Sequence, residues 1–196
     1  MRRRSGRRDE LAMNEPAMRP ESFSIRDSEP GDVPAITAIY AHSVMTSAAT
    51  FDEQPPSAEE MRQRRAEVID SGLPFIVAVG DDGHVFGYAY AAAFRRRTGY
   101  RFTLEDSVYV ERTATHRGIG TALLTALIER CAAAGYRQMV AVIADTERAA
   151  SIGLHEKLGF KMVGVLPAVG FKFRRWIDVV LMQRALGPDS SAAPQA

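Results

Sequence analysis

Hydrophobic and polar positions alternate in some segments, as in strands, and recur at helical spacing in others. The first half of the chain begins with one expected strand and one expected helix. Phe23 and Ile25 alternate with polar residues, which predicts a short strand. Asp32 then precedes an apolar stretch, as is typical of a helix start, and we expect this helix to run to about Met45. The folded part of the chain is therefore expected to begin near Ser22.

A capping signal marks the second helix. Ser57 is followed three residues later by Glu60, the spacing at which each side chain bonds the backbone amide of the other. A charged helix is expected from this point, with an irregular loop at 46–56 ahead of it. Two apolar segments, 75–79 and 85–94, flank a turn and predict a hairpin.

The second half of the chain completes a mixed sheet. The remaining expected elements are strands at 100–110, 139–143, 160–169 and 177–183 and helices at 118–134 and 148–158. One crossover helix joins two strands within an otherwise antiparallel series. The expected fold class is therefore α+β, with a mixed, mostly antiparallel central sheet flanked by about four helices in a single domain.

Composition agrees with one globular domain. The 196 residues are 46% hydrophobic and 25% charged, and we expect this domain at 22–186, between a disordered basic N-terminal arm at 1–21 and a disordered C-terminal tail at 187–196. The net charge of +1 gives no global reason to expect a nucleic acid or a membrane as partner. The single cysteine, Cys131, allows no internal disulfide, so a cytoplasmic location is the default expectation. The histidines lack the spacing of a metal site, and none is expected.

Candidate chemistry begins where the strand at 100–110 ends and the next helix starts. The loop and first turn consist of Thr115, His116, Arg117, Gly118, Ile119, Gly120 and Thr121. The first amides of a helix have no internal partners and carry partial positive charge, and glycines let phosphate oxygens approach the backbone. This segment predicts an anion cradle that suits a diphosphate. A Gly-x-Gly alone is a weak signal, because a tight turn without chemistry has the same pattern; a dinucleotide or nucleoside triphosphate site would need a longer glycine motif.

Longer motifs are more specific, and at these the chain resembles the GNAT acetyltransferases. The acetyl-CoA motif of that family is matched by Val108-Tyr109-Val110 followed by Arg117-Gly118-Ile119-Gly120-Thr121-Ala122-Leu123-Leu124. The last helix of the family resembles His155-Glu156-Lys157-Leu158-Gly159-Phe160. The phosphinothricin and methionine sulfoximine branch is similar at Val169-Gly170-Phe171-Lys172-Phe173 and Trp176-Ile177-Asp178-Val179. The likeness covers about 22–186.

The resemblance implies a GNAT-like fold, a homodimer, and acetyl-CoA as cosubstrate without a metal. It also implies cofactor contacts from Val108, Tyr109, Val110, Thr115, His116, Arg117, Gly118, Ile119, Gly120, Thr121 and Arg148. Thr115 stands where the family usually has Gln or Arg, and Arg148 where an Asn usually contacts the cofactor. Since backbone amides hold most of the diphosphate, we expect binding with altered affinity. Arg174 replaces a glycine near the last strand pair, which leaves the conformation of that turn open.

The reaction implied by the resemblance is transfer of an acetyl group from acetyl-CoA to the amine of a small, amino-acid-like substrate by direct attack in a ternary complex. Along 100–110 the side chains alternate, so Glu105 shares the polar face with Ser107 and Tyr109 and is the candidate general base. A bulge would shift this parity, and a solvated strand carboxylate is the alternative. His155 occupies a position where many family members carry a tyrosine acid; it either protonates or steadies the leaving thiolate, or packs for structure. Substrate contacts are expected from Phe51, Arg96, Arg97, Thr98, Tyr100, Glu105, Asp106 and Ser107.

Two other functions fit the same sequence. An acetyltransferase acting on a protein N-terminus or another amine keeps the fold and the cofactor but needs an open groove. A noncatalytic acyl-CoA-binding regulatory module, with the basic arm on nucleic acid, keeps the cradle but needs no Glu105. The arginine run at 95–97 would then be a solvated loop, and Phe51 a buried core residue.

Overall fold

The computed structural model describes residues 22–144 and 149–193, so the expected N-terminal arm at 1–21 lies outside the described residues. The strands are β1 (Phe23–Asp27), β2 (Phe75–Gly80), β3 (Val85–Ala93), β4 (Thr103–Val110), β5 (Gln138–Ala144), β6 (Lys161–Lys172) and β7 (Arg175–Ala185). The helices are α1 (Val33–Thr46), α2 (Ala58–Asp70), α3 (Ile119–Ala133) and α4 (Ala149–Lys157). Short 3-10 turns lie at Pro30–Asp32, Thr98–Tyr100 and Arg112–Ala114.

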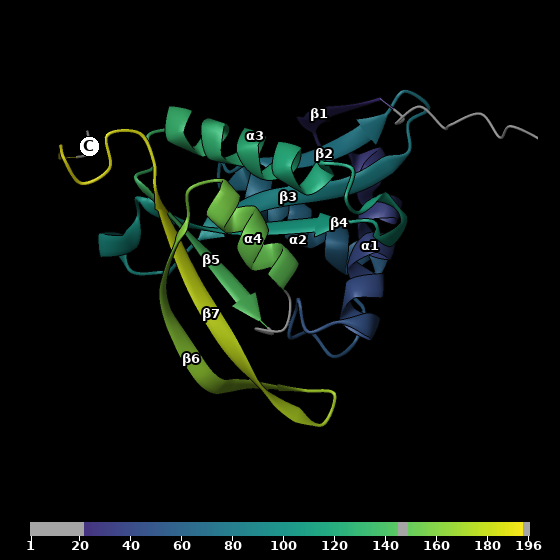
Figure 1. Cartoon of the computed structure of the whole chain (residues 1–196). Helices are drawn as coiled ribbons and strands as arrows, with labels where there is room; N and C mark the ends of the chain where they lie inside the picture. The colour runs from purple at the N-terminus through teal and green to yellow at the C-terminus, as the bar shows by residue number, and fades with distance from the viewer. Residues whose placement is uncertain (1–21, 145–148, 194–196) are drawn as a thin grey trace, which may run out of the picture.

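All seven strands form one twisted sheet in the order β1-β2-β3-β4-β5-β7-β6 (Figure 1). Neighbouring strands are antiparallel except β4 and β5, which are parallel because α3 crosses over between them. The predicted α+β class, with a mostly antiparallel sheet and four helices, is confirmed.

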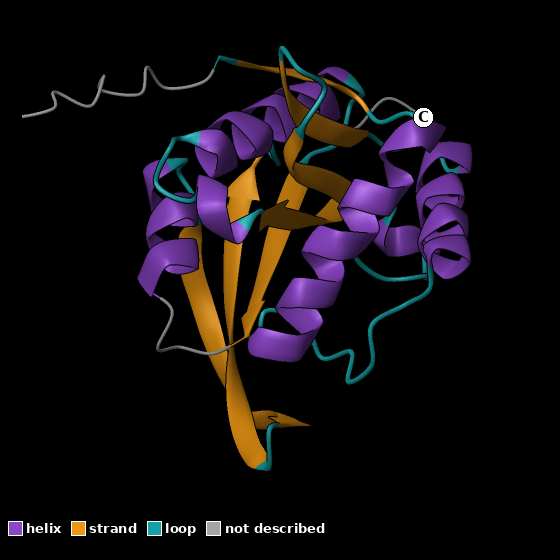
Figure 2. Ribbon diagram, turned by 90° about the vertical axis from the view of Figure 1, so that its right-hand side faces the viewer, coloured by secondary structure: helices purple, strands orange, loops and turns teal. Residues whose placement is uncertain are grey.

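Helices cover both faces of the sheet (Figure 2). On one face, α3 packs Leu123, Leu124 and Leu127 against sheet residues such as Ile76 and Met139, and all five side chains are fully buried. Burial of each leucine stabilises the fold by about 1.5–3 kcal/mol. Apolar residues of α4 pack at the border of the same cluster. This face therefore holds α3 and α4 beside the middle of the sheet.

The second face is covered by α1 and α2. Ile36 and Tyr40 of α1 and Met61 of α2 are buried against Phe75 and Tyr88 of the sheet. The aromatic rings of Phe75 and Tyr88 stack with their centres 5.6 Å apart. A second core thus lies behind β4, on the side opposite α3.

The predicted capping box opens α2. The Ser57 hydroxyl accepts a hydrogen bond from the Glu60 amide at 3.2 Å, and the Glu60 carboxylate accepts one from the Ser57 amide at 2.6 Å. Two amides that the first helical turn leaves unpaired are thereby satisfied. The start of α2 is fixed by these two side chains, as the sequence predicts.

The predicted boundaries of three strands were wrong. The strand expected from residue 100 begins only at Thr103, because Thr98–Tyr100 forms a 3-10 turn. The last two strands are longer than predicted and join in a hairpin whose turn holds Phe173 at φ 52° and Arg174 at φ 60°. Both turn residues are left-handed, the conformation that a two-residue type I′ hairpin turn requires. Arg174 therefore adopts the conformation that a glycine would take at lower cost.

β6 lies at the outer edge of the sheet, and the hairpin it forms with β7 extends away from the helices (Figure 1). Many of its large apolar side chains are exposed, among them Val163, Val169 and Phe171. None of the helices within residues 22–144 and 149–193 has the length and apolar character needed to cross a bilayer.

Candidate active site

β4 and β5 pair over a short stretch and then separate. Residues 103–105 of β4 pair with 138–140 of β5, and the pairing stops there although both strands continue. A cavity of about 250 Å³ is lined by 106–110, by 141–144 and by one side of α4. Because β3 and β7 occupy the outer edges, the edges that face the cavity have no neighbouring strand. An extended ligand that carries amide groups can hydrogen-bond to these edges as an added strand would.

The N-terminus of α3 lies at this cavity. Gly118, the residue that caps the helix, has a φ of 81°, and His116 has a φ of 63°. Backbone amides around left-handed residues form a concave nest for anions, and the unpaired amides of the first helical turn add positive potential. A Cβ added to Gly120 would lie 3.4 Å from Leu154 and 3.6 Å from Val110, which both line the cavity. A diphosphate at α3 would therefore be continuous with an extended chain between the strands, so the cradle and the split together fit coenzyme A.

The side chains predicted to contact the cofactor serve different purposes. The Arg117 guanidinium carbon lies 4.8 Å from the centre of the Phe86 ring. The Thr115 hydroxyl donates to a backbone carbonyl three residues earlier at 3.0 Å. Ile119 is 1% exposed, so its side chain belongs to the core. Arg148 lies outside the described residues. The remaining predicted positions that line the cavity or the first turn of α3 are Val108, Tyr109, Val110 and Thr121.

The two faces of β4 present different chemistry. The register between β3 and β4 is continuous, so no bulge changes the alternation along β4. Tyr109 stacks on Tyr88 at 5.1 Å and so marks the face covered by α1, which Glu105 and Ser107 share. Asp106 points to the opposite face and meets α4. The structure therefore separates Asp106 from the other two acidic or polar residues predicted to contact substrate.

Glu105 is a half-buried carboxylate near the point where the strands separate. Burial raises the pKa of its carboxyl, the negative charge of Asp106 raises it further, and Arg95 opposes both effects. A carboxylate with a raised pKa is a stronger base than a solvated one. This environment suits proton transfer better than that of a freely solvated strand residue.

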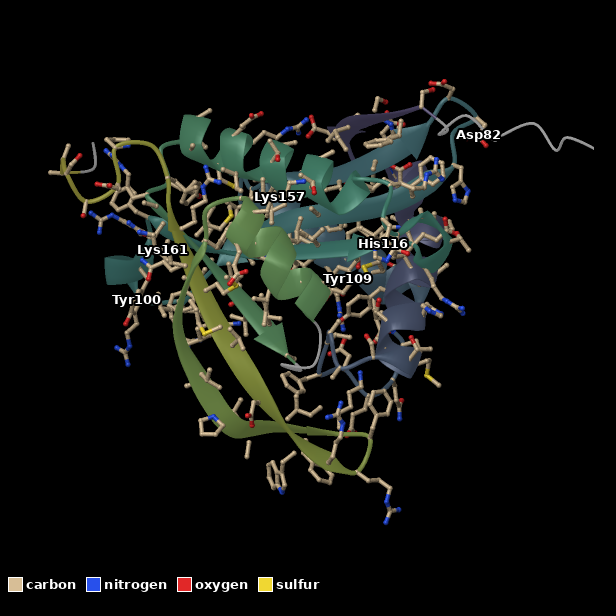
Figure 3. All side chains as sticks on the ribbon, viewed as in Figure 1. Asp82, Tyr100, Tyr109, His116, Lys157 and Lys161 are labelled. Atoms are coloured by element: carbon tan, nitrogen blue, oxygen red, sulfur yellow. The ribbon has the colours of Figure 1, made fainter. Side chains whose placement is uncertain are left out.

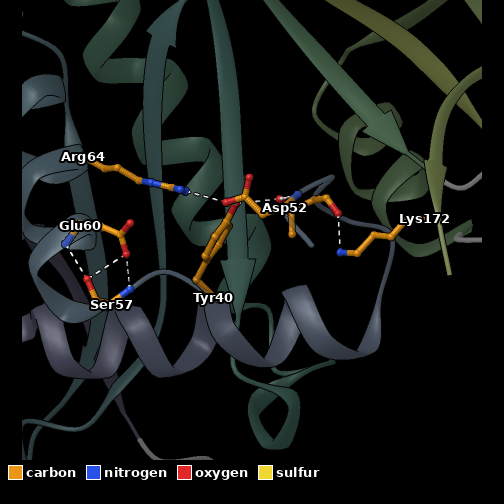
Figure 4. Close-up of polar contacts among 7 residues, drawn as sticks. Tyr40, Asp52, Ser57, Glu60, Arg64 and Lys172 are labelled. Atoms are coloured by element: carbon orange, nitrogen blue, oxygen red, sulfur yellow. Dashed lines mark hydrogen bonds and ion pairs between the residues drawn. The ribbon is translucent and has the colours of Figure 1, made fainter. Parts of the chain in front are cut away.

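A hydrogen-bonded network fixes the loop between α1 and α2 (Figure 4). The Asp52 carboxylate accepts from the Tyr40 hydroxyl at 2.9 Å and from Arg64 at 2.8 Å. Although burial acts in the opposite sense, these two donors hold the pKa of Asp52 below its ordinary value. The Thr50 hydroxyl lies 2.7 Å from the Tyr40 hydroxyl. The loop is therefore anchored to both helices.

The same loop is tied to β6. Lys172 is only 3% exposed, and its ammonium donates to the carbonyls of Ser47 at 3.1 Å and Thr50 at 2.8 Å. The ring of Phe51 packs so closely on Gly170 that a Cβ there would overlap it. No local pattern in the sequence could have found these contacts, because their partners lie more than a hundred residues apart.

His155 and Asp106 form a buried pair beside the cavity. The His155 Nε2 lies 3.0 Å from an Asp106 carboxylate oxygen, and Nδ1 lies 2.7 Å from the Ser151 carbonyl. Burial lowers the pKa of His155, but the Asp106 carboxylate and the Ser151 carbonyl outweigh it and the pKa is raised. Both side chains line the cavity.

The predicted substrate segment before β4 is exposed. Arg96, Arg97, Thr98 and Tyr100 are all on the surface. In Figure 3, Tyr100 lies on the side of the molecule opposite His116. The structure thus does not bring this segment to the anion cradle. The positive charge of Arg95, the residue just ahead of this segment, opposes the rise in the pKa of Glu105.

Comparison with known proteins agrees with this geometry. Residues 25–181 match the family model of the acetyltransferase (GNAT) domain. The chain is 51% identical over 172 residues to phosphinothricin N-acetyltransferase of Alcaligenes faecalis, covering 88% of this chain and 87% of that protein. It is 43% identical over 171 residues to L-methionine sulfoximine/L-methionine sulfone acetyltransferase of Pseudomonas aeruginosa, covering 87% and 99%.

A solved structure extends the likeness to three dimensions. The phosphinothricin acetyltransferase of Sinorhizobium meliloti in complex with acetyl-CoA superposes with a TM-score of 0.85 at 46% identity, covering 88% of this chain and 93% of that one. The family predicted from the sequence is confirmed. With its crossover helix, its split strands and this sequence similarity, the chain belongs to the GNAT family of acetyl-CoA-dependent N-acetyltransferases.

Proposed function

We propose that this protein transfers the acetyl group of acetyl-CoA to the amine of a small amino-acid-like substrate of the phosphinothricin, methionine sulfoximine or methionine sulfone type. The observation that carries the proposal is the cavity at the β4–β5 split, which adjoins the α3 cradle and lies next to Glu105. Relatives named for these substrates are 43% and 51% identical to the chain.

Two parts of the chain would bind acetyl-CoA. Backbone amides from His116 to Thr121 would hold the diphosphate, and the free edges of β4 and β5 would hold the amide-bearing arm. Bound acetyl-CoA supplies an electrophilic thioester carbonyl. Amides at the end of β4, near Val110, would stabilise negative charge on that carbonyl oxygen during attack.

Glu105 is the proposed general base. An α-amine with a pKa near 8 is mostly protonated at pH 7, and freeing it costs only about 1.4 kcal/mol. Holding amine and thioester in attack geometry can contribute on the order of 7–11 kcal/mol, so positioning is the larger effect. Glu105 removes the amine proton directly or through a water molecule. The amine nitrogen would then attack the thioester carbonyl within one ternary complex, without an acetylated enzyme. The C–S bond breaks, and the coenzyme A thiolate leaves with the second proton that the nitrogen loses.

Recognition of the acceptor is assigned to the Glu105 face of β4, to the loop between α1 and α2, and to the exposed segment ahead of β4. Phe51 would form a wall of the pocket, and Ser107 lies on the Glu105 face of β4. Arg96 and Arg97, with Thr98 and Tyr100, would provide donors for a carboxylate or phosphinate, for which the planar guanidinium is suited.

A thiol-release assay tests the proposal. The full chain is mixed with acetyl-CoA and one acceptor at a time: phosphinothricin, methionine sulfone, free amino acids, or a peptide with a free N-terminus. We expect coenzyme A release with the first two acceptors and little with the peptide. Preference for the peptide would favour a protein N-terminal acetyltransferase. Binding of acetyl-CoA without release with any acceptor would favour a noncatalytic module.

We also propose that the protein is a homodimer that pairs through the outer edge of β6. Among the described strands β6 pairs only with β7, and residues 162–171 carry no charged side chain. Uncharged apolar edges are normally blocked in monomers, because they associate with other strands. A second copy of the same edge satisfies this need symmetrically.

The oligomeric state is measured by light scattering after gel filtration. We expect a dimer mass for the parent and a monomer mass for Val165→Glu, since Val165 is 45% exposed on β6. Ile69→Glu, at an exposed residue of α2, is the matched control and should remain a dimer. A monomeric parent would remove the dimer from the proposal.

The proposed location of the enzyme is the cytoplasm. The single cysteine, Cys131, is buried, which raises the pKa of its thiol to about 12, so the thiol remains protonated and needs no oxidising environment. Fractionation with a tagged chain tests the location, and recovery of the enzyme outside the cytoplasm would contradict it.

A further inference from the structure

The Asp106–His155 pair is more constrained than a packed histidine needs to be. The two residues come from β4 and α4, 49 positions apart, and their side chains are 2% and 5% exposed. Nε2 faces a carboxylate and Nδ1 faces a backbone carbonyl. Both partners are hydrogen-bond acceptors, so both ring nitrogens must carry a proton for both bonds to form.

This geometry argues against direct proton donation to a sulfur atom. A histidine that donates from both nitrogens to protein acceptors has no hydrogen directed into the cavity. An imidazolium next to a carboxylate is also neutral as a pair, so it contributes little field to a developing thiolate. The pair is therefore better suited to holding elements together than to acid catalysis.

The position of the pair shows which elements it joins. Asp106 is the first residue after the last β4–β5 pair, so it stands at the apex of the split. His155 lies on the side of α4 that lines the same cavity. The pair therefore bridges the strand and the helix across the inner end of the cavity. The other carboxylate oxygen of Asp106, Oδ1, is buried without a hydrogen-bond partner among the described residues.

Few other ionisable groups face this pair. Cys131 of α3 lies near Asp106, and its thiol is protonated. Glu105, the residue before Asp106, lies on the opposite face of β4. The ring of Phe160, before β6, meets the His155 ring edge-on at 4.9 Å. The carboxylate of Asp106 is thus the acceptor through which α4 is attached to β4.

We propose that Asp106 is a positioning residue, which acts through His155 to fix α4 against β4. This contact keeps the cavity at the width that acetyl-CoA binding needs. This role presupposes the proposed acetyl-CoA site but not the identity of the acceptor amine. Removing the link should weaken acetyl-CoA binding more than it slows turnover at saturating acetyl-CoA.

Conservative substitutions separate the two roles of His155. Gln places its amide nitrogen where Nε2 lies, so His155→Gln keeps the bond to Asp106 but cannot give up a proton. We expect His155→Gln to retain kcat and to lose less acetyl-CoA affinity than His155→Ala and Asp106→Asn, which should lose affinity on the order of tenfold, as for one charge-assisted hydrogen bond. An acid role would make His155→Gln as slow as His155→Ala.

The measurements are calorimetric titration with acetyl-CoA in the absence of any acceptor, and thiol-release kinetics. His84→Ala is the matched control, because His84 forms a similar 2.8 Å pair with Glu111 on the surface. Its affinity should match the parent. A lower melting temperature in His155→Ala with unchanged acetyl-CoA affinity would show that the pair contributes only to the stability of the fold, and would overturn the proposal.

The pH dependence of binding gives an independent readout. The raised pKa of His155 means that both hydrogen bonds and the charge assistance at Asp106 are present below the unfolded pKa, and that one bond and the charge assistance are lost as pH rises through the folded pKa. Acetyl-CoA affinity of the parent should therefore fall over that interval, and that of His155→Gln should not. An identical pH profile for the two proteins would contradict the role, whereas failure to bind acetyl-CoA at any pH would instead contradict the proposed function.

Discussion

Replacement of Glu105 by Gln tests the proposed base with almost no change in shape. A positioned general base contributes about 10² to 10⁴ in rate. That range corresponds to roughly 2.7–5.4 kcal/mol of transition-state stabilisation, at about 1.36 kcal/mol for each factor of ten. We therefore expect kcat/KM for the acceptor to fall by this factor at pH 7, while affinity for acetyl-CoA remains unchanged.

The pH profile makes this prediction sharper. Burial and the neighbouring Asp106 raise the pKa of Glu105, with Arg95 opposing, so the acid limb of the parent profile should lie above the ordinary range of a glutamate. The Gln variant should lack this limb. Its deficit should also shrink by about tenfold as pH rises past the amine pKa near 8, because more of the substrate then arrives unprotonated.

Steady-state thiol release across pH 5 to 9.5, on the order of ten pH values for each protein, provides both readouts. Glu129→Gln is the matched control, because Glu129 is an exposed carboxylate on α3. It should follow the parent throughout. A Glu105→Gln enzyme with the same rate and the same acid limb as the parent would show that Glu105 is a solvated strand residue.

Four further substitutions probe the cradle, the loop and the hairpin. Gly118→Ala should weaken coenzyme A binding by about 5- to 30-fold in calorimetry, because a side chain at φ 81° costs about 1–2 kcal/mol. Gly120→Ala should keep its affinity within about threefold of the parent, since the nearest atom lies 3.4 Å from the added Cβ. Lys172→Met should lower the unfolding free energy in urea by about 1–3 kcal/mol, because two buried carbonyls lose their donor; an unchanged midpoint would contradict this. Arg174→Gly should raise the melting temperature, since relief of about 1–2 kcal/mol of left-handed strain exceeds the roughly 0.5–1 kcal/mol entropic cost of glycine, and a lower melting temperature would refute the strain.

Local signals in the sequence were enough to predict most of the fold. The capping box of Ser57 and Glu60 acts within four residues, and the crossover helix after β4 follows from apolar periodicity and flanking glycines. The start of β4 was misplaced because a 3-10 turn at Thr98–Tyr100 has no strong local signature. The length of the last hairpin was underestimated, since its exposed apolar residues lack the alternation of a half-buried strand.

The candidate site was predictable only in part. Motifs within one segment, such as the turn from His116 to Gly118, indicated the cradle. Parity along β4 indicated which side of the strand Glu105 faces, but Asp106 was grouped with substrate residues because its partner is 49 positions away. The ties of Lys172 to the α1–α2 loop depend on how the completed sheet brings β6 beside that loop. Contacts of this kind are set by tertiary packing and have no local pattern.

The first turn of α3 and the split between β4 and β5 are together proposed to bind acetyl-CoA. Hydrogen–deuterium exchange of the full chain, with and without coenzyme A, tests this binding site directly. We expect slower exchange at the amides of 116–121 and 141–144 when coenzyme A is bound, and little change in β1. Saturating coenzyme A that leaves both of those segments unprotected would contradict it.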